Sequence, residues 1–153
     1  MSADPDGLAA ADADDMDLDD DLMAAIAAAE AAVGEMASDY PEMLRQDVML
    51  LEQATHKLRL HARGTEDHTK ACVDAFGVLH DIKGQAASFG FEAATALCDP
   101  LCECVRGHSE VAPHILDLIE AAVGLLNRMV SEGATADLES AAYVLLKKVP
   151  QTS

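Results

Sequence analysis

Apolar residues recur at helical spacing along most of this 153-residue chain. They follow one another at steps of three and four, which gathers them on one side of a helix, whereas a strand would need strict alternation. The clearest run lies within residues 40–63 and consists of Leu44, Val48, Leu51, Thr55, Leu58 and Ala62. Each helix of this kind has one face that must be covered by a partner. The spacing therefore predicts an all-α fold, and the low aromatic content of 3% agrees with it.

The pattern predicts six helices with short connections. Pro41 after Asp39 starts the second helix, Gly64 and Gly90 follow the second and third, and Pro100 should kink or restart the fourth. Long amphipathic helices with short connections pack as antiparallel neighbours. We therefore expect a four-helix bundle with an additional helix at each end of the chain. The predicted helices cover residues 22–37, 40–63, 66–89, 91–106, 112–131 and 135–149.

Negative charge dominates the chain and is concentrated at its start. The formal net charge is −18, and residues 1–21 contain nine Asp and no Lys or Arg. A surface of this sign repels nucleic acid and anionic membranes. We interpret residues 1–21 as a disordered acidic tail and residues 22–153 as one helical domain. Since we find neither a secretory signal nor an apolar stretch long enough to span a bilayer, we expect a cytoplasmic protein. We also expect it to be a monomer.

His80 faces away from the apolar side of the third predicted helix. At about 100° per residue, the apolar side occupies a sector of roughly 100°, and His80 lies about 140° from its centre. We therefore expect an exposed imidazole, which is a nucleophile in its neutral form. The apolar side consists of Cys72, Ala75, Leu79, Ile82, Ala86 and Phe89.

Two glycines and a lysine surround this histidine on the helix. Gly77 and Gly84 lie three residues before and four residues after His80. Each glycine costs a helix about 1 kcal/mol relative to alanine, so their presence suggests that another backbone or a bulky group must come close. Lys83 lies one turn from His80, where its ammonium can neutralise an anion on the ring. These are the requirements for accepting and releasing a phosphoryl group.

The run from Leu79 to Gly90 also carries a recognisable motif. Its residues His80, Lys83, Gly84 and Gly90 match the HxxKGxxxxxG signature. The run thus resembles histidine-containing phosphotransfer (HPt) domains, the four-helix-bundle carriers of multistep phosphorelays. The resemblance implies that His80 is phosphorylated, that Lys83 neutralises the phosphoryl group, that Gly84 leaves space and that Gly90 ends the helix. Gln85 departs from the small residue common at its position, and it either hydrogen-bonds the imidazole or projects into solvent.

The resemblance also implies the partners. The receiver domain of a hybrid histidine kinase would donate the phosphoryl group from its phospho-aspartate, and a response regulator would accept it. The Mg²⁺ for this transfer would belong to the receiver, so we expect no cofactor of the chain's own and no kinase activity. The expected docking surface around His80 consists of Val73, an exposed Phe76, Gly77, Gln85 and Ala87.

Two other interpretations stay open on the sequence. The chain could be a helical adaptor that binds receivers without phosphotransfer. It could also bind a metal through cysteine and histidine, although the spacing of Cys98, Cys102 and Cys104 matches neither zinc pairs nor ferredoxin clusters. We interpret these cysteines as small buried apolar residues, predict no metal site, and assign no function to the five histidines other than His80.

Overall fold

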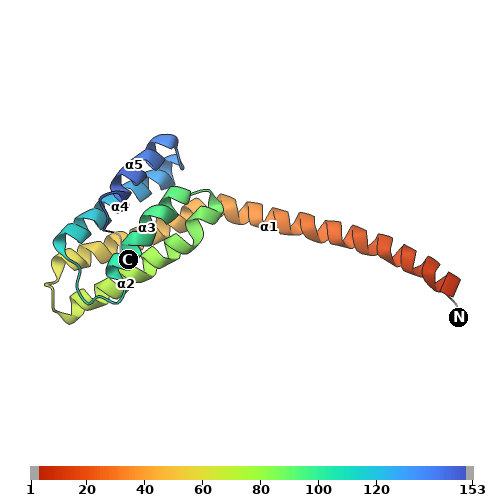
Figure 1. Cartoon of the computed structure of the whole chain (residues 1–153), viewed down its shortest axis with the longest axis horizontal. Coiled ribbons are helices and arrows are strands. Elements are labelled where there is room, and N and C mark those ends of the chain that lie inside the picture. Colours follow the sequence, from red (N-terminus) through yellow and green to blue (C-terminus); the bar gives the residue numbers. More distant parts are fainter. Residues whose placement is uncertain (1–3, 151–153) are drawn as a thin grey trace. The chain divides into compact units, whose positions relative to one another are not determined.

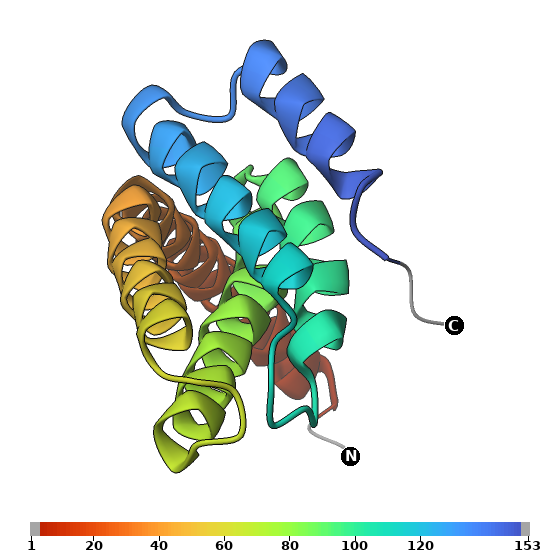
Figure 2. The ribbon, with the colours of Figure 1, turned by 90° about the vertical axis from the view of Figure 1, so that its left-hand side faces the viewer.

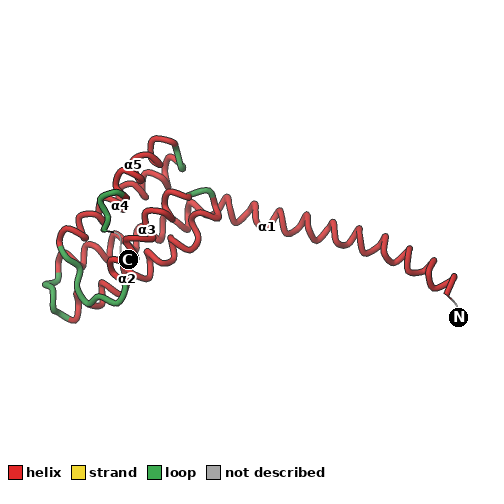
Figure 3. Tube along the Cα trace, viewed as in Figure 1, coloured by secondary structure: helices red, strands yellow, loops and turns green. Residues whose placement is uncertain are grey.

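The computed structural model describes the backbone of residues 4–150 and the side chains of residues 20–32 and 39–150. Over this range the secondary structure is helical throughout, with loops between the helices and no strand (Figures 1 and 3). The prediction of an all-α fold is therefore confirmed. The elements in chain order are α1 (Asp4–Leu60), α2 (Glu66–Gln85), the 3₁₀ helix η1 (Ala86–Phe89), α3 (Glu92–Val105), α4 (Pro113–Glu132) and α5 (Ala136–Leu146).

The first helix is longer than the sequence predicts. α1 continues through Pro41, so the predicted break between residues 37 and 40 is wrong. A proline inside a helix removes one backbone hydrogen bond and crowds the preceding turn, at a cost of about 3 kcal/mol, yet the backbone before and after Pro41 is helical. The chain nevertheless divides by compactness close to the proline, into the units Met1–Asp39 and Tyr40–Ser153.

Residues 4–21 are also part of α1, where the sequence predicts a disordered tail. Every described side chain from Asp20 to Ala32 is exposed.

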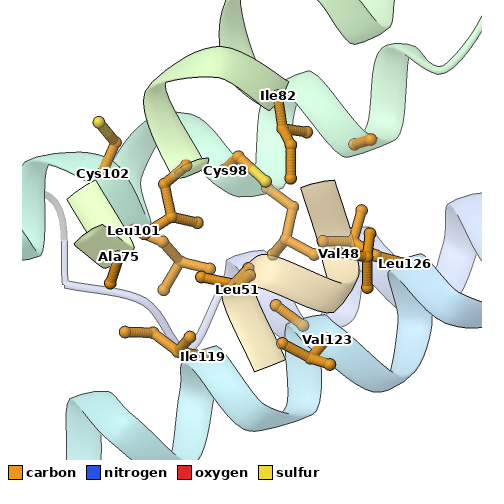
Figure 4. Packing of buried hydrophobic residues seen from close by; sticks show 14 of the residues in the cluster. Val48, Leu51, Ala75, Ile82, Cys98, Leu101, Cys102, Ile119, Val123 and Leu126 are labelled. Carbon is orange, nitrogen blue, oxygen red and sulfur yellow. The ribbon is translucent and has the colours of Figure 1, made fainter. Parts of the chain in front are cut away.

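The hydrophobic core lies within the unit Tyr40–Ser153. The last six turns of α1 line up Tyr40, Leu44, Val48, Leu51 and Leu58 on one face, and all of them are buried. Figure 4 shows residues of α1, α2, α3 and α4 converging on one another, which confirms the four-helix core. α2 packs against α3, and α5 lies beside α3 and α4 (Figure 2). The core residues that can be followed in Figure 4 are Val48, Leu51, Ala75, Ile82, Cys98, Leu101, Cys102, Ile119, Val123 and Leu126.

The buried side chain of His68 forms hydrogen bonds with two connections between helices. His68 in the first turn of α2 is 1% exposed. Its Nδ1 lies 3.0 Å from the carbonyl oxygen of His61, and its Nε2 accepts a hydrogen bond of 3.1 Å from the backbone N–H of Val111. The α1–α2 connection and the α3–α4 connection are thereby held together. His68 is thus a structural residue, a role that the sequence did not reveal.

The remaining helices follow the prediction closely at their ends. Thr65 caps α2 by accepting from the backbone N–H of His68 at 3.2 Å, and Thr135 caps α5 in the same way. α3 runs through Pro100 without restarting. Within the part of the chain that the structure describes, none of the helices combines the length and apolar character that crossing a membrane requires.

Candidate functional site

α2 has a buried side and an exposed side, and His80 lies on the exposed one. Cys72, Ala75, Leu79 and Ile82 are buried against the core, as their spacing predicts. The imidazole of His80 is open to solvent. Past this position α2 ends at Gln85 and the chain tightens into η1, which Gly90 terminates with a φ of +91°. That φ lies in the left-handed region that favours glycine.

Open space lies around both glycines that flank the histidine. Gly77 and Gly84 are exposed, and a Cβ atom added to either would meet no atom within 4 Å. The internal packing of the bundle therefore does not require glycine at these positions. Their small size leaves the surface beside His80 free for something outside the chain.

Phe76 lies beside the histidine, but it is less open than the sequence predicts. Its ring is half-buried, and the ring centroid lies 5.8 Å from that of His80. The guanidinium of Arg106 at the end of α3 lies over the same ring, with its central carbon 5.0 Å from the centroid. The expectation of an exposed Phe76 is therefore corrected, because a cation and the neighbouring helix cover part of the ring.

Arg106 brings a second cation to this surface. Its Nε donates to a carboxylate oxygen of Glu103 at 2.8 Å, and this hydrogen bond is the largest cause of the raised pKa of Arg106. Arg106 was not predicted, because it lies at the end of another helix, 26 residues after His80. Only the packing of α2 against α3 brings it near Phe76.

Lys83 is engaged with a carboxylate of the neighbouring helix. Its Nζ lies 3.0 Å from Oδ1 of Asp99 on α3. The hydrogen bond with Asp99 raises the pKa of Lys83, so the side chain carries its positive charge throughout the physiological range. Like Arg106, Asp99 was not among the site residues predicted from the sequence.

A groove between α1 and α2 adjoins the histidine surface. It encloses about 400 Å³, and both Val73 and Gly77 line it from α2. From α1 it is lined by Leu50, which is 51% exposed and was missed because it belongs to a different helix. Two carboxylates, Asp74 and Asp81, also line the groove.

The structure does not gather all the predicted docking residues into this groove. Val73 is 63% exposed and lines it, and Phe76 lies with Val73 along a second hollow on the α3 side. Ala87 is exposed on η1, and its backbone N–H donates to Oγ1 of Thr95 at 2.8 Å. Gln85 is exposed at the end of α2.

The cysteines do not form a metal centre among the described residues. Cys72, Cys98 and Cys102 are buried and Cys104 is half-buried, all four as free thiols. Burial raises the pKa of each of these thiols, which disfavours the thiolate that a metal needs. No group of three or more His, Cys, Asp or Glu side chains within the described ranges could hold a metal ion.

Comparison with known proteins agrees with the motif and the helical architecture. No curated protein and no solved structure gives a significant match to the chain. A family model described as Hpt domain matches residues 17–132, which is more than half of the chain and includes α2 with His80. The chain therefore belongs to the Hpt domain family, whose members carry phosphoryl groups in phosphorelays.

Proposed function

We propose that His80 accepts a phosphoryl group from the phospho-aspartate of a hybrid-kinase receiver domain and passes it to a response regulator. One observation carries this proposal: the histidine of the family motif is exposed on a rigid helix, with open space at Gly77 and Gly84. A nucleophile that must meet another protein's side chain needs this access. The protein would thus be a carrier without kinase activity of its own.

The transfer would be a displacement at phosphorus. An unprotonated nitrogen of His80 attacks, the bond between phosphorus and the aspartyl oxygen breaks, and the carboxylate leaves with the electron pair. The imidazole gives up its N–H proton to water. The reverse sequence then delivers the phosphoryl group to the second receiver. In this proposal Mg²⁺ belongs to the receiver, and no residue of this chain holds it.

Residues around His80 would serve charge neutralisation and access. Lys83 would neutralise the phosphoryl group from one turn along α2. Gly84 and Gly77 would leave room for the receiver's backbone and for the phosphoryl group itself. Arg106 adds a cation over the ring of Phe76, with its central carbon 5.0 Å from the ring centroid.

The receiver would dock over the exposed side of α2 and the groove beside it. Val73 and Gly77 line that groove together with Leu50 of α1, and they offer an apolar surface next to the nucleophile. Phe76, Gln85 and Ala87 would contact the receiver closer to the imidazole. Because Phe76 is half-buried, only the exposed part of its ring would make this contact.

The test is a labelling assay with the whole chain. A receiver domain phosphorylated by its hybrid kinase is mixed with the protein, and acid-labile, base-stable label is measured. We expect label on the unchanged protein and on His114→Gln, a control that removes another exposed histidine, and none on His80→Gln. Tight binding of the receiver without label would favour the adaptor function and overturn the proposal, as would label that persists in His80→Gln.

A further inference from the structure

The cation next to the nucleophile is already bound by a carboxylate. Nζ of Lys83 lies 3.0 Å from Oδ1 of Asp99, and the Lys83 side chain is only 29% exposed. Asp99 is 58% exposed, so the pair sits at the edge of the α2–α3 interface. Lys83 therefore does not extend freely into solvent beside His80.

Near Lys83 lies a second carboxylate, that of Glu103, which pairs with Arg106. Glu103 lies one turn along α3 from Asp99, and its charge also raises the pKa of Lys83. Its carboxylate, however, accepts from Nε of Arg106 at 2.8 Å. The carboxylate that pairs with Lys83 is thus that of Asp99.

A phosphoryl group on His80 would need the same ammonium. His80 and Lys83 are three residues apart on α2 and are neighbours on its surface. One lysine has a single charge, and an ion pair with Asp99 neutralises part of it. Moving Lys83 to the phosphoryl group would leave Asp99 without its partner, close to a new dianion.

We propose that Asp99 is a positioning residue that competes with the phosphoryl group for Lys83 and thereby lowers the stability of phosphorylated His80. The inference rests on the proposed function of His80 as the phosphoryl acceptor. Its consequence is a carrier that gives up its phosphoryl group more readily than one with a free lysine.

The experiment measures an equilibrium without any receiver. The full chain is held in a fixed mixture of potassium phosphoramidate and ammonium. In the reaction the P–N bond of phosphoramidate breaks, a bond from phosphorus to the imidazole nitrogen forms, and ammonia leaves with the proton that the imidazole gives up. Phosphorus NMR then gives the ratio of phosphorylated His80 to phosphorylated His56, an exposed histidine of α1 that serves as internal reference. His80→Gln and His56→Gln assign the two signals.

Asp99→Asn should raise this ratio roughly two- to fivefold, the range typical of one exposed ion pair. Asp99→Glu should keep it near the unchanged protein's value, because the charge is retained. The matched control is Glu92→Gln, which removes an exposed carboxylate from the same helix and should not change the ratio. Lys83→Met should give a lower ratio than the unchanged protein. The double variant Lys83→Met/Asp99→Asn should give nearly the same ratio as Lys83→Met alone.

Several outcomes would overturn the inference. An unchanged or lower ratio in Asp99→Asn would mean that Asp99 does not compete for Lys83. An equal rise in the Lys83→Met background would mean that Asp99 acts directly and not through the lysine, and an equal rise in Glu92→Gln would mean a general charge effect. Failure of a phosphorylated receiver to label His80 would instead overturn the proposed function, so the two failures can be told apart.

Discussion

Tyr40 is a fully buried residue whose hydroxyl group has no hydrogen-bond partner among the described side chains. Its ring stacks on Phe89, with centroids 4.5 Å apart and planes at 12°, and tilts against Phe91 at 5.7 Å. Among the described residues no hydrogen bond reaches the hydroxyl oxygen, although it is shielded from solvent. A buried hydroxyl without a hydrogen bond costs free energy, while the stacked ring contributes favourably.

Replacing Tyr40 by phenylalanine should therefore stabilise the protein. The change Tyr40→Phe keeps the ring and removes the unpaired hydroxyl, so we expect the free energy of unfolding to rise by about 1 kcal/mol. Urea unfolding at neutral pH measures this as a higher midpoint with an unchanged slope. A drop of similar size would show that the hydroxyl has a partner, such as a bound water, in solution.

The difference in the free energy of unfolding between Tyr40→Phe and the unchanged protein should become larger at high pH. Burial, followed by the charges of Asp47 and Cys98, raises the pKa of Tyr40 from 10.0 to about 12. The neutral phenol is favoured in the folded state, so its contribution is complete below pH 10 and is lost as the pH rises towards 12. The full loss amounts to about 3 kcal/mol. Tyr40→Phe should lack this component, which is measured as the difference between the two unfolding curves from pH 9 to pH 12.

The orientation of single residues was predictable only within one helix. Spacing along α2 predicted that His80 would be exposed and Leu79 buried, because the helical repeat fixes the face of each residue. The ion pair from Lys83 to Asp99 depends on how α3 is rotated against α2, and no local pattern contains that information. The position of Arg106 over Phe76 was missed for the same reason.

At the scale of elements, the helices after residue 40 were predicted well, whereas both ends of the first predicted helix, 22–37, were not. Gly64, Gly90 and Gly107 all adopt positive φ between helices, so these stops have a cause in the backbone. Pro41 was ambiguous, because proline fits the first turn of a new helix and is also tolerated inside a long one. Which of the two occurs depends on whether the preceding residues stay helical. The proline itself does not indicate whether the residues before it are helical.

The glycines of α2 should limit its stability in exchange for access to His80. Gly77 lies in the middle of the helix, and a Cβ there would meet no atom within 4 Å. Gly77→Ala should therefore raise the free energy of unfolding by about 0.5 to 1 kcal/mol, while transfer from a phosphorylated receiver becomes slower because the methyl group stands in the docking surface. Thermal unfolding and the rate of label transfer measure the two effects.

Gly124 provides the matched control for this prediction. It is an exposed glycine in the middle of α4, and a Cβ there would also meet nothing within 4 Å. Gly124→Ala should give the same gain in stability and leave transfer unchanged. If both variants transferred at the normal rate, the space at Gly77 would have no role in docking.

At the scale of the whole molecule, the acidic first segment, Met1–Asp39, and the bundle, Tyr40–Ser153, are two compact units. The core extends from Tyr40 to Val149, and the described side chains of residues 20–32 are exposed. Residues 1–38 contain eleven acidic side chains and no basic one, so their removal changes the formal net charge from −18 to −7. The family match begins at residue 17, so part of the matched segment lies outside the core.

Deleting residues 1–38 should therefore leave a bundle that folds and carries phosphate. We expect its free energy of unfolding to stay within about 0.5 kcal/mol of the full chain, because no described side chain before Tyr40 is buried. The affinity for a receiver should change at low salt, because the deletion removes negative charge. Salt screens such long-range repulsion or attraction, so the change should become smaller at high salt. A full-length variant with the nine Asp of residues 1–21 replaced by Asn separates charge from helix, and it should bind the receiver as the deletion does at low salt. Loss of cooperative unfolding in the deletion alone would show instead that the first segment packs against the bundle and completes its core.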